Sequence, residues 1–161
     1  MTFIGFLTEK KDENKFKKEL KTILQKSNIK AVVVAINEKN IENVKNIRFQ
    51  TIIIDRNIEN AETDKLKSIL KGTKYLIVNA DVIYMEKIQN MNLTLITYGF
   101  SSKSTITASS VDGEDMLFCL QRSVHSINNK KNEPQELKSS TRISNKYLRM
   151  ALIAMEILYK T

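Results

Sequence analysis

The segment "LITYGFSSKSTITASSV", residues 95–111, separates two regions of different pattern. Before it, β-branched runs alternate with amphipathic segments. After it, short apolar stretches follow one another without long helical separators. Strands that alternate with helices predict a parallel sheet with right-handed crossovers, whereas strands joined by turns predict antiparallel pairing. The segment therefore marks the point at which a parallel α/β region gives way to an antiparallel one.

Strand and helix signals alternate before residue 100. Runs such as "AVVVAI" at 31–36 are typical of strands buried on both faces of a sheet. Segments such as "ENKFKKELKTILQKS" at 13–27 place apolar residues at helical spacing. The predicted strands are 2–8, 31–36, 50–55, 74–81 and 93–100, and the predicted helices are 13–27, 40–46, 62–72 and 82–90. We expect a three-layer, Rossmann-like α/β fold with a mostly parallel, five-stranded sheet and helices on both faces.

The remaining residues predict a small antiparallel β insert and a closing helix. Strand signals at 104–111, 116–124 and 134–139 surround the turn signal "DGED". The stretch "SNKYLRMALIAMEILYK" at 144–160 predicts a helix with Ser144 as its N-cap, apolar enough to pack on the body of the protein or on a partner. We expect one domain, 1–161, divided into a parallel part (1–100), an antiparallel part (101–140) and the helix (141–161).

The bulk composition indicates a folded cytoplasmic domain. A chain of 161 residues with 42% apolar content is long enough to bury a core. The single cysteine, Cys119, makes no intrachain disulfide, which fits a reducing compartment. The first residues lack the basic start and apolar core of a signal peptide, and no window approaches the length of a membrane span. We therefore predict a cytoplasmic protein with no membrane span.

The net charge of +8 raises the question of nucleic-acid binding. Residues 122–149 carry seven basic residues against two acidic ones, but few aromatic residues lie among them. Base stacking on aromatic side chains is thus not indicated. The abundance of Lys, Asn and Ile along the whole chain suggests a coding bias, so a nucleic-acid partner is not expected.

Catalytic and metal-binding motifs are scarce. The only histidine, His125, and Cys119 are the sole candidates for a nucleophilic pair, and a lone histidine near a strand end is usually structural, so no catalytic residue is predicted. The sequence contains no CxxC or HxxxH spacing, so no metal site is predicted. The segment "EKKDENKF" after the first strand lacks glycine, whereas a phosphate-binding loop needs glycines there.

Polar residues at the ends of two predicted strands form the candidate ligand site. Asn79 and Asp81 follow one strand, and Tyr98 and Gly99 end the next. Ligands of open α/β sheets bind beyond the carboxyl ends of the strands. An asparagine amide can read an adenine edge, and an aspartate can hold a ribose or an ammonium group. The alternative is that Asn79 and Asp81 only cap the helix that follows.

The order of motifs over residues 74–161 resembles the central domain of the Mur ligases and their folylpolyglutamate synthetase relatives. The resemblance rests on "YLIVNAD", "LTLITYGFSSKSTITASSV" and the closing "NKYLRMALIAMEIL". In that family a strand ends in Asn-x-Asp-Asp, and the next strand leads into Tyr-Gly or Phe-Gly. The chain departs from the family at Val82, which replaces the second Asp, at the missing phosphate-binding loop, and at "TRISNKY", which lacks the family's Gly and His.

The resemblance and its departures together predict a noncatalytic Mur-ligase-like domain. It would act by binding a cell-wall precursor, a nucleotide or a protein partner, and no cofactor is expected apart from a possible ATP. Cell-wall precursors carry a diphosphate, for which Arg122, Arg142 and Arg149 are candidate ligands. The last helix is a second candidate surface. The alternative is a small nucleotide-binding regulator or enzyme that uses the strand-end residues Asn79 and Asp81 with Tyr98.

Overall fold

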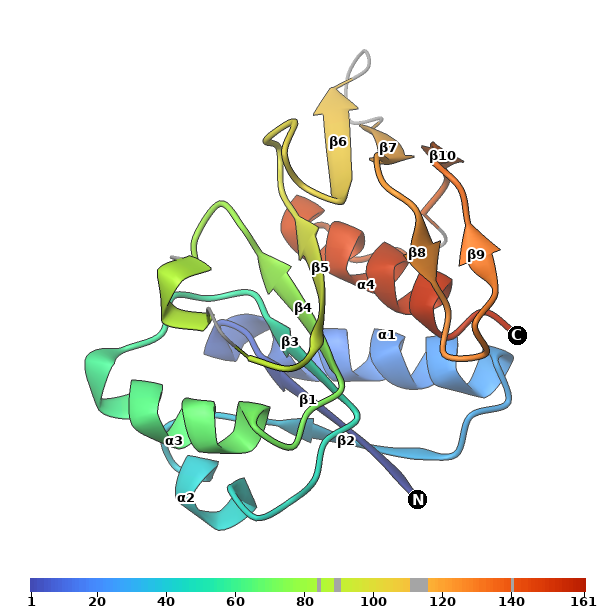
Figure 1. Ribbon diagram of the computed structural model, residues 1–161. Coiled ribbons are helices and arrows are strands. Elements are labelled where there is room, and N and C mark those ends of the chain that lie inside the picture. Colours follow the sequence, from blue (N-terminus) through green and yellow to red (C-terminus); the bar gives the residue numbers. More distant parts are fainter. Residues whose placement is uncertain (84, 89–90, 111–115, 140) are drawn as a thin grey trace.

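The computed structural model describes residues 1–83, 85–88, 91–110, 116–139 and 141–161 (Figure 1). Its elements, in chain order, are β1 (Thr2–Leu7), the 3-10 helix η1 (Lys10–Asp12), α1 (Glu13–Lys26), β2 (Ala31–Ala35), α2 (Ile41–Val44), β3 (Thr51–Ile54), α3 (Asn60–Leu70), β4 (Tyr75–Asn79), the 3-10 helix η2 (Met85–Ile88), β5 (Thr94–Tyr98), β6 (Ile106–Ser110), β7 (Met116–Leu120), β8 (Val124–His125), β9 (Lys131–Asn132), β10 (Gln135–Leu137) and α4 (Lys146–Leu158).

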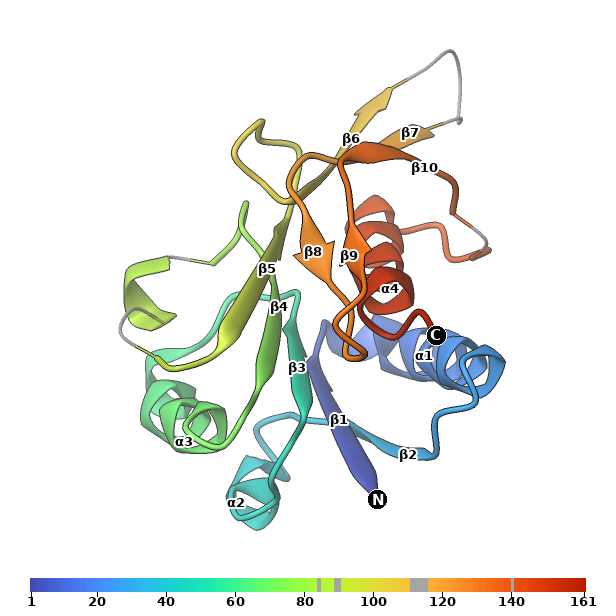
Figure 2. The ribbon, with the colours of Figure 1, turned by 45° about the vertical axis from the view of Figure 1, so that its right-hand side comes forward.

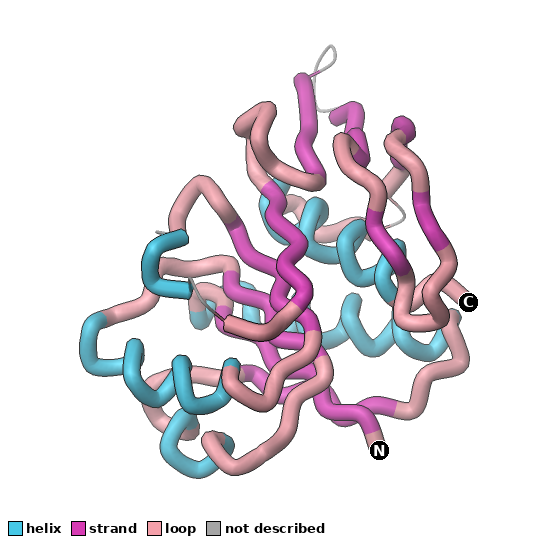
Figure 3. The backbone as a smooth tube through the Cα atoms, in the orientation of Figure 1, coloured by secondary structure: helices cyan, strands magenta, loops and turns pink. Residues whose placement is uncertain are grey.

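A central, mostly parallel sheet confirms the predicted fold class. Within the described residues, eight strands lie in the order β10-β7-β6-β5-β4-β3-β1-β2, and the run from β2 to β6 is parallel. Strands β1 to β5 run side by side through the middle of the molecule, and β6, β7 and β10 lie at its upper edge in this view (Figure 3). Helices α1 and α4 cover one face, and α2 and α3 cover the other (Figure 1). The domain is therefore a three-layer α/β structure.

The antiparallel region differs in one respect from the prediction, because most of it extends the main sheet. Strand β6 joins β5 in parallel through the pair Tyr98 and Ile106, and β7 and β10 then add in antiparallel register. The separate small sheet is the β8–β9 hairpin, which lies over the carboxyl half of α4 (Figure 2). The predicted "DGED" turn, at 112–115, lies outside the described residues.

Differences from the predicted helices are clearest at α3, in the segment 82–90 and at the start of α4. Helix α3 begins at Asn60 because Glu59 and Glu62 form a reciprocal capping box. In the described part of 82–90, only η2 is helical. Helix α4 is capped by Asn145 rather than Ser144, since the Asn145 Oδ1 atom accepts the backbone N–H groups of Tyr147 (3.0 Å) and Leu148 (3.2 Å).

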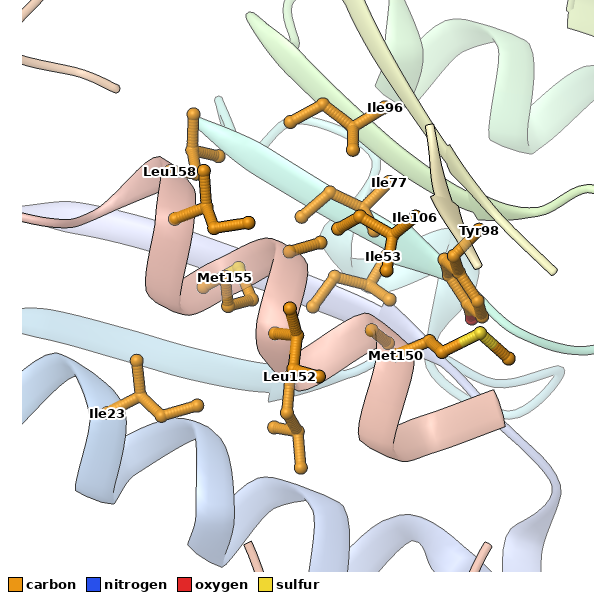
Figure 4. Close-up of a cluster of buried hydrophobic side chains, with 14 of the residues drawn as sticks. Ile23, Ile53, Ile77, Ile96, Tyr98, Ile106, Met150, Leu152, Met155 and Leu158 are labelled. Carbon is orange, nitrogen blue, oxygen red and sulfur yellow. The ribbon is translucent and has the colours of Figure 1, made fainter. Parts of the chain in front are cut away.

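Helix α4 lies in the core of the protein. Its side chains meet the sheet through Ile53, Ile77 and Ile96, and its other neighbours are α1 and β8 (Figure 4). The backbone N–H of Ile127 donates to the carbonyl of Leu158, which ties the β8–β9 hairpin to the end of the helix. The helix therefore packs on the body, and its apolar faces are not a free surface for a partner. Across the described ranges, no helix combines the length and apolar character needed to cross a membrane.

A buried hydroxyl pair links β3 to the end of α4. The Thr51 Oγ1 and Tyr159 OH atoms are 2.6 Å apart, and both residues are fully buried. Burial raises the pKa of Tyr159 to about 12, so its hydroxyl keeps its proton. We expect Tyr159→Phe to lower the free energy of unfolding by about 1–3 kcal/mol, because Thr51 is left without its partner. Urea unfolding measures this, and adding Thr51→Val should restore part of the loss. A double variant no more stable than Tyr159→Phe would contradict the coupling.

Candidate functional site

Three parallel strands bring polar side chains together where they end. Asp55 follows β3, Asn79 ends β4, and Tyr98 ends β5 in register with Asn79. The Tyr98 hydroxyl donates to the Oδ1 atom of Asp55 at 2.5 Å. The Asn79 Nδ2 atom donates to the same oxygen at 3.3 Å. Two neutral donors therefore converge on one carboxylate oxygen at the carboxyl-end edge of the sheet.

A second carboxylate, Asp81, joins this group to helix α4. The Asn79 Oδ1 atom accepts the backbone N–H of Asp81 at 3.0 Å. The Asp81 Oδ2 atom accepts the Tyr147 hydroxyl and the backbone N–H of Phe100, both at 2.9 Å. A Cβ atom at Gly99 would lie 2.6 Å from the Asp81 Oδ1 atom, so this close approach needs a glycine. We call Asp55, Asn79, Asp81, Tyr98 and Tyr147 the carboxylate cluster.

Burial controls the protonation of the cluster. Asp55 is partly buried, and desolvation raises its pKa from 3.8 to about 6, although the hydrogen bonds from Tyr98 and Asn79 act in the opposite direction. The negative charges of Asp12 and Glu9 add a smaller upward contribution. Burial and the neighbouring Asp55 charge also raise the pKa of Tyr98 well above its ordinary value. The Asp55 carboxyl group therefore gains or loses its proton near pH 6, and a nearby cation would favour its deprotonated, charged form.

A cavity of about 460 Å³ opens at the carboxyl ends of β1, β2 and β3, where the strand order reverses between β1 and β3, and no residue of the carboxylate cluster lines it. Ligands of doubly wound sheets bind at such switch points. Its lining residues are Thr8, Glu9, Lys10, Glu13, Asn37, Glu38, Lys39, Arg56, Asn57 and Glu59. Asp12 and Glu13 occupy the first turn of α1, the position at which a phosphate-binding protein presents free N–H groups. The acidic side chains there disfavour a phosphate, although Lys10, Lys39 and Arg56 also line the cavity, so its charge is mixed.

Comparisons with known proteins identify no family. No protein-family model matches the sequence, and no curated protein matches it. The flavodoxin-like domain of a Synechococcus sp. protein is 12% identical over 60% of this chain and 81% of that chain, with a TM-score of 0.38. A flavodoxin from the domain Archaea is 10% identical over 64% of this chain and 87% of that chain, with a TM-score of 0.35. Values this low support no inference about ligand or activity.

The four strand-end residues of the sequence analysis lie in this one site, but their accessibility differs. Asn79 is 1% exposed, and its amide is bonded to Asp55 and Asp81, so the side chain organises the cluster. The backbone carbonyl of Asn79 accepts from Val82 and Ile83, which forms a turn ahead of η2. Tyr98 is fully buried, whereas Asp81 is exposed. Asp81 is therefore the member of the predicted set that is exposed to solvent.

The other candidates are dispersed. Arg122 lines an opening between β5 and β8, and neither Arg142 nor Arg149 lines it. The Arg149 Nε atom donates to the carbonyl of Ile143 at 2.6 Å. One of the guanidinium nitrogens that would bind a diphosphate is therefore already engaged within the protein. Cys119 lies in β7 of the main sheet and His125 in the separate hairpin. In the described part of the chain, no three His, Cys, Asp or Glu side chains are placed to hold a metal ion.

Two residues of the carboxylate cluster, Asp55 and Tyr147, were not predicted from the sequence. Asp55 ends the buried run "TIIID", and this position at a strand end is the same signal that singled out Asn79 and Asp81. Applying the signal to every strand would have found it. Tyr147 lies in the first turn of α4, far along the chain from Asp81, and no local pattern indicates that the two meet.

Proposed function

We propose that the chain is a noncatalytic Mur-ligase-like domain that acts by binding, and that its ligand presents a basic group to the carboxyl-end edge of the sheet. The observation that carries the proposal is Asp55, a carboxyl group held at a strand end with a pKa of about 6. Perturbed carboxyl groups at such edges are typical of functional sites. A ligand cation beside Asp55 would stabilise its charged form and offset the cost of burying it.

The surroundings of α1 support binding rather than ATP-dependent ligation. Glu9, Asp12 and Glu13 surround the start of the helix, and no glycine lies between β1 and α1. A triphosphate at this position would meet like charge without a cradle of backbone N–H groups. The same acidic residues attract an ammonium or guanidinium group toward Asp55, although Lys10 and Lys11 of η1 offset part of their negative charge. A cell-wall precursor with a free amine and a protein partner with an exposed lysine or arginine both supply this chemistry.

Proton release tests the proposal. We expect L-lysinamide to bind at pH 6 and to displace protons from Asp55, so that the calorimetric enthalpy depends on the ionisation enthalpy of the buffer. The variant Asp55→Asn should remove this buffer dependence while the protein stays folded. Arg142→Gln, which changes the charge at an exposed position away from the cluster, is the control and should bind with unchanged proton release.

ATP with Mg²⁺ is the competing probe. Saturable ATP binding that is lost in Asn79→Ala would contradict the proposal and favour the nucleotide-binding regulator instead. Lysinamide binding that is unchanged in Asp55→Asn would also contradict it, because the cation would then bind elsewhere.

A further inference from the structure

The central sheet has a gap on one side of β5. Strands β4 and β5 pair along five residues, from Tyr75 with Thr94 to Asn79 with Tyr98. On the other side, in the described part of the chain, β5 pairs with β6 only at Tyr98, and the Thr97 hydroxyl oxygen accepts the Thr105 N–H just before β6. Beyond that pair, β6 and β7 continue away from β5, and the β8–β9 hairpin lies across the gap (Figures 1 and 2). The amino half of β5 is therefore a strand edge inside the sheet.

Backbone groups of β5 face this gap. The Thr94 N–H donates to the Lys74 carbonyl, and the Tyr98 carbonyl accepts from Ala80 on the β4 side. In a parallel strand, alternate residues direct their backbone groups to the same neighbour. Thr94, Ile96 and Tyr98 thus face β4, and Leu95 directs its N–H and C=O groups into the gap. The Leu95 side chain is 40% exposed.

The hairpin presents a second edge from the opposite side. The Ser126 N–H donates to the Lys130 carbonyl, and β8 and β9 pair Val124 with Asn132 and His125 with Lys131. In an antiparallel ladder these bonds alternate, so the backbone groups of His125 point away from β9. A cavity of about 640 Å³ lies between the hairpin and β5, with residues 94–96 on one side and 122–127 on the other.

The charge of this opening is positive. Lys74 and Arg122 line it, and within the described residues no Asp or Glu does. Glu133 lies near the rim, but Lys131 (3.1 Å) and Ser123 (3.0 Å) already hold its carboxylate. The opening therefore combines unpaired strand backbone with basic side chains, whereas the cavity at the carboxyl-end edge is lined by both acidic and basic residues.

We propose that an extended, acidic peptide segment of a partner protein adds as a strand between β5 and β8. Main-chain hydrogen bonds to an exposed strand edge supply affinity in this mode of recognition, and alternate side chains supply specificity. Ile96 and Val124 are buried and so face inward, whereas Leu95 and His125 are exposed. A partner strand fits this slot if it turns apolar residues inward and acidic residues outward, toward Arg122. The inference goes beyond the proposed function and uses a different surface.

The test uses the full chain and the heptapeptide acetyl-Val-Glu-Val-Glu-Val-Glu-Val-amide. We expect binding, with the amide hydrogen exchange of Leu95 slowed about tenfold at saturation. Arg122→Gln should weaken the affinity by about tenfold, because a charge-assisted contact is lost. Arg142→Gln, which makes the same charge change away from the opening, should bind as the unmodified chain does.

Two peptide controls separate strand addition from charge attraction. A Val-Lys peptide of the same length should not bind, and a Val-Glu peptide with N-methylated valines and glutamates should lose binding because its backbone donors are gone. Equal binding of the N-methylated peptide, or no binding of the parent peptide at millimolar concentration, would overturn the proposal. A concentration-dependent dimer that protects Leu95 without peptide would also overturn it, since a second copy would then fill the slot.

Discussion

Replacing Asp55 by Asn is expected to stabilise the fold at pH 8 by about 3 kcal/mol. The pKa of Asp55 rises from 3.8 to about 6 on folding, so the native state holds its proton more tightly than the unfolded state does. The stability of the protein therefore falls as the pH rises from about 4 to 6, and the deficit persists above that range. An asparagine carries no charge to desolvate, and its Oδ1 atom can still accept from Tyr98 and Asn79.

Urea unfolding of both proteins at several pH values between 4 and 8 measures this effect. The difference between Asp55→Asn and the unmodified chain should grow across the window and then level off. Asp64→Asn, at an exposed position of α3, makes the same change in net charge and is the matched control. A constant difference at every pH, or an equal gain in Asp64→Asn, would show that the burial of Asp55 is not the cause.

Replacing Arg56 by Ala is expected to destabilise the fold by about 3–5 kcal/mol at pH 7. The Arg56 Nη1 and Nη2 atoms donate to the two carboxylate oxygens of Glu62 at 2.9 and 2.7 Å. The two side chains are only 13% and 4% exposed. Removing the guanidinium leaves the Glu62 carboxylate buried without a counter-charge, and Arg56 is also the main reason that the pKa of Glu62 is lowered.

The double variant Arg56→Ala with Glu62→Gln isolates the cause. The glutamine keeps an acceptor for the backbone N–H of Glu59 and carries no charge, so we expect it to recover part of the lost free energy of unfolding. Lys65→Ala removes the partner of an exposed pair, in which the Lys65 Nζ and Glu42 Oε2 atoms are 3.1 Å apart. This control should leave the urea midpoint almost unchanged. A similar loss in both single variants would argue against burial as the decisive factor.

Most of the strands and helices could be predicted from the sequence because the buried positions of each element form a local pattern of apolar residues. The strand at 74–81 is an apolar run, and its structural counterpart, Tyr75–Asn79, is buried throughout. The helix at 144–160 shows an apolar pattern on nearly every side, which fits its position in the core. By contrast, β6 joins β5 through the pair Tyr98 and Ile106 and through hydrogen bonds between Thr97 and Thr105, which no local pattern indicates. Strand order and register are tertiary properties, so the extension of the main sheet was not predicted.

The candidate site was predicted in part for the same reason. Asn79, Asp81 and Tyr98 stand at strand ends, and parallel strands bring their carboxyl ends to one edge. That geometry could be expected, but the role of each side chain could not. The amide of Asn79 turned inward because Asp55 and the backbone of Asp81 offered partners there. The contact between Asp81 and Tyr147 joins distant parts of the chain through packing alone.

The central position of α4 has a consequence for the order of events during synthesis. A nascent chain whose ribosome has not yet reached Lys146 can form β1 to β5, but Ile53, Ile77 and Ile96 would then lie on a face of the sheet that α1 alone covers in part. Contacts between segments this far apart form slowly, and exposed apolar strands invite aggregation. We therefore expect cotranslational folding of this protein to pause at an aggregation-prone intermediate. Folding is completed only when α4 has emerged and packs on the sheet.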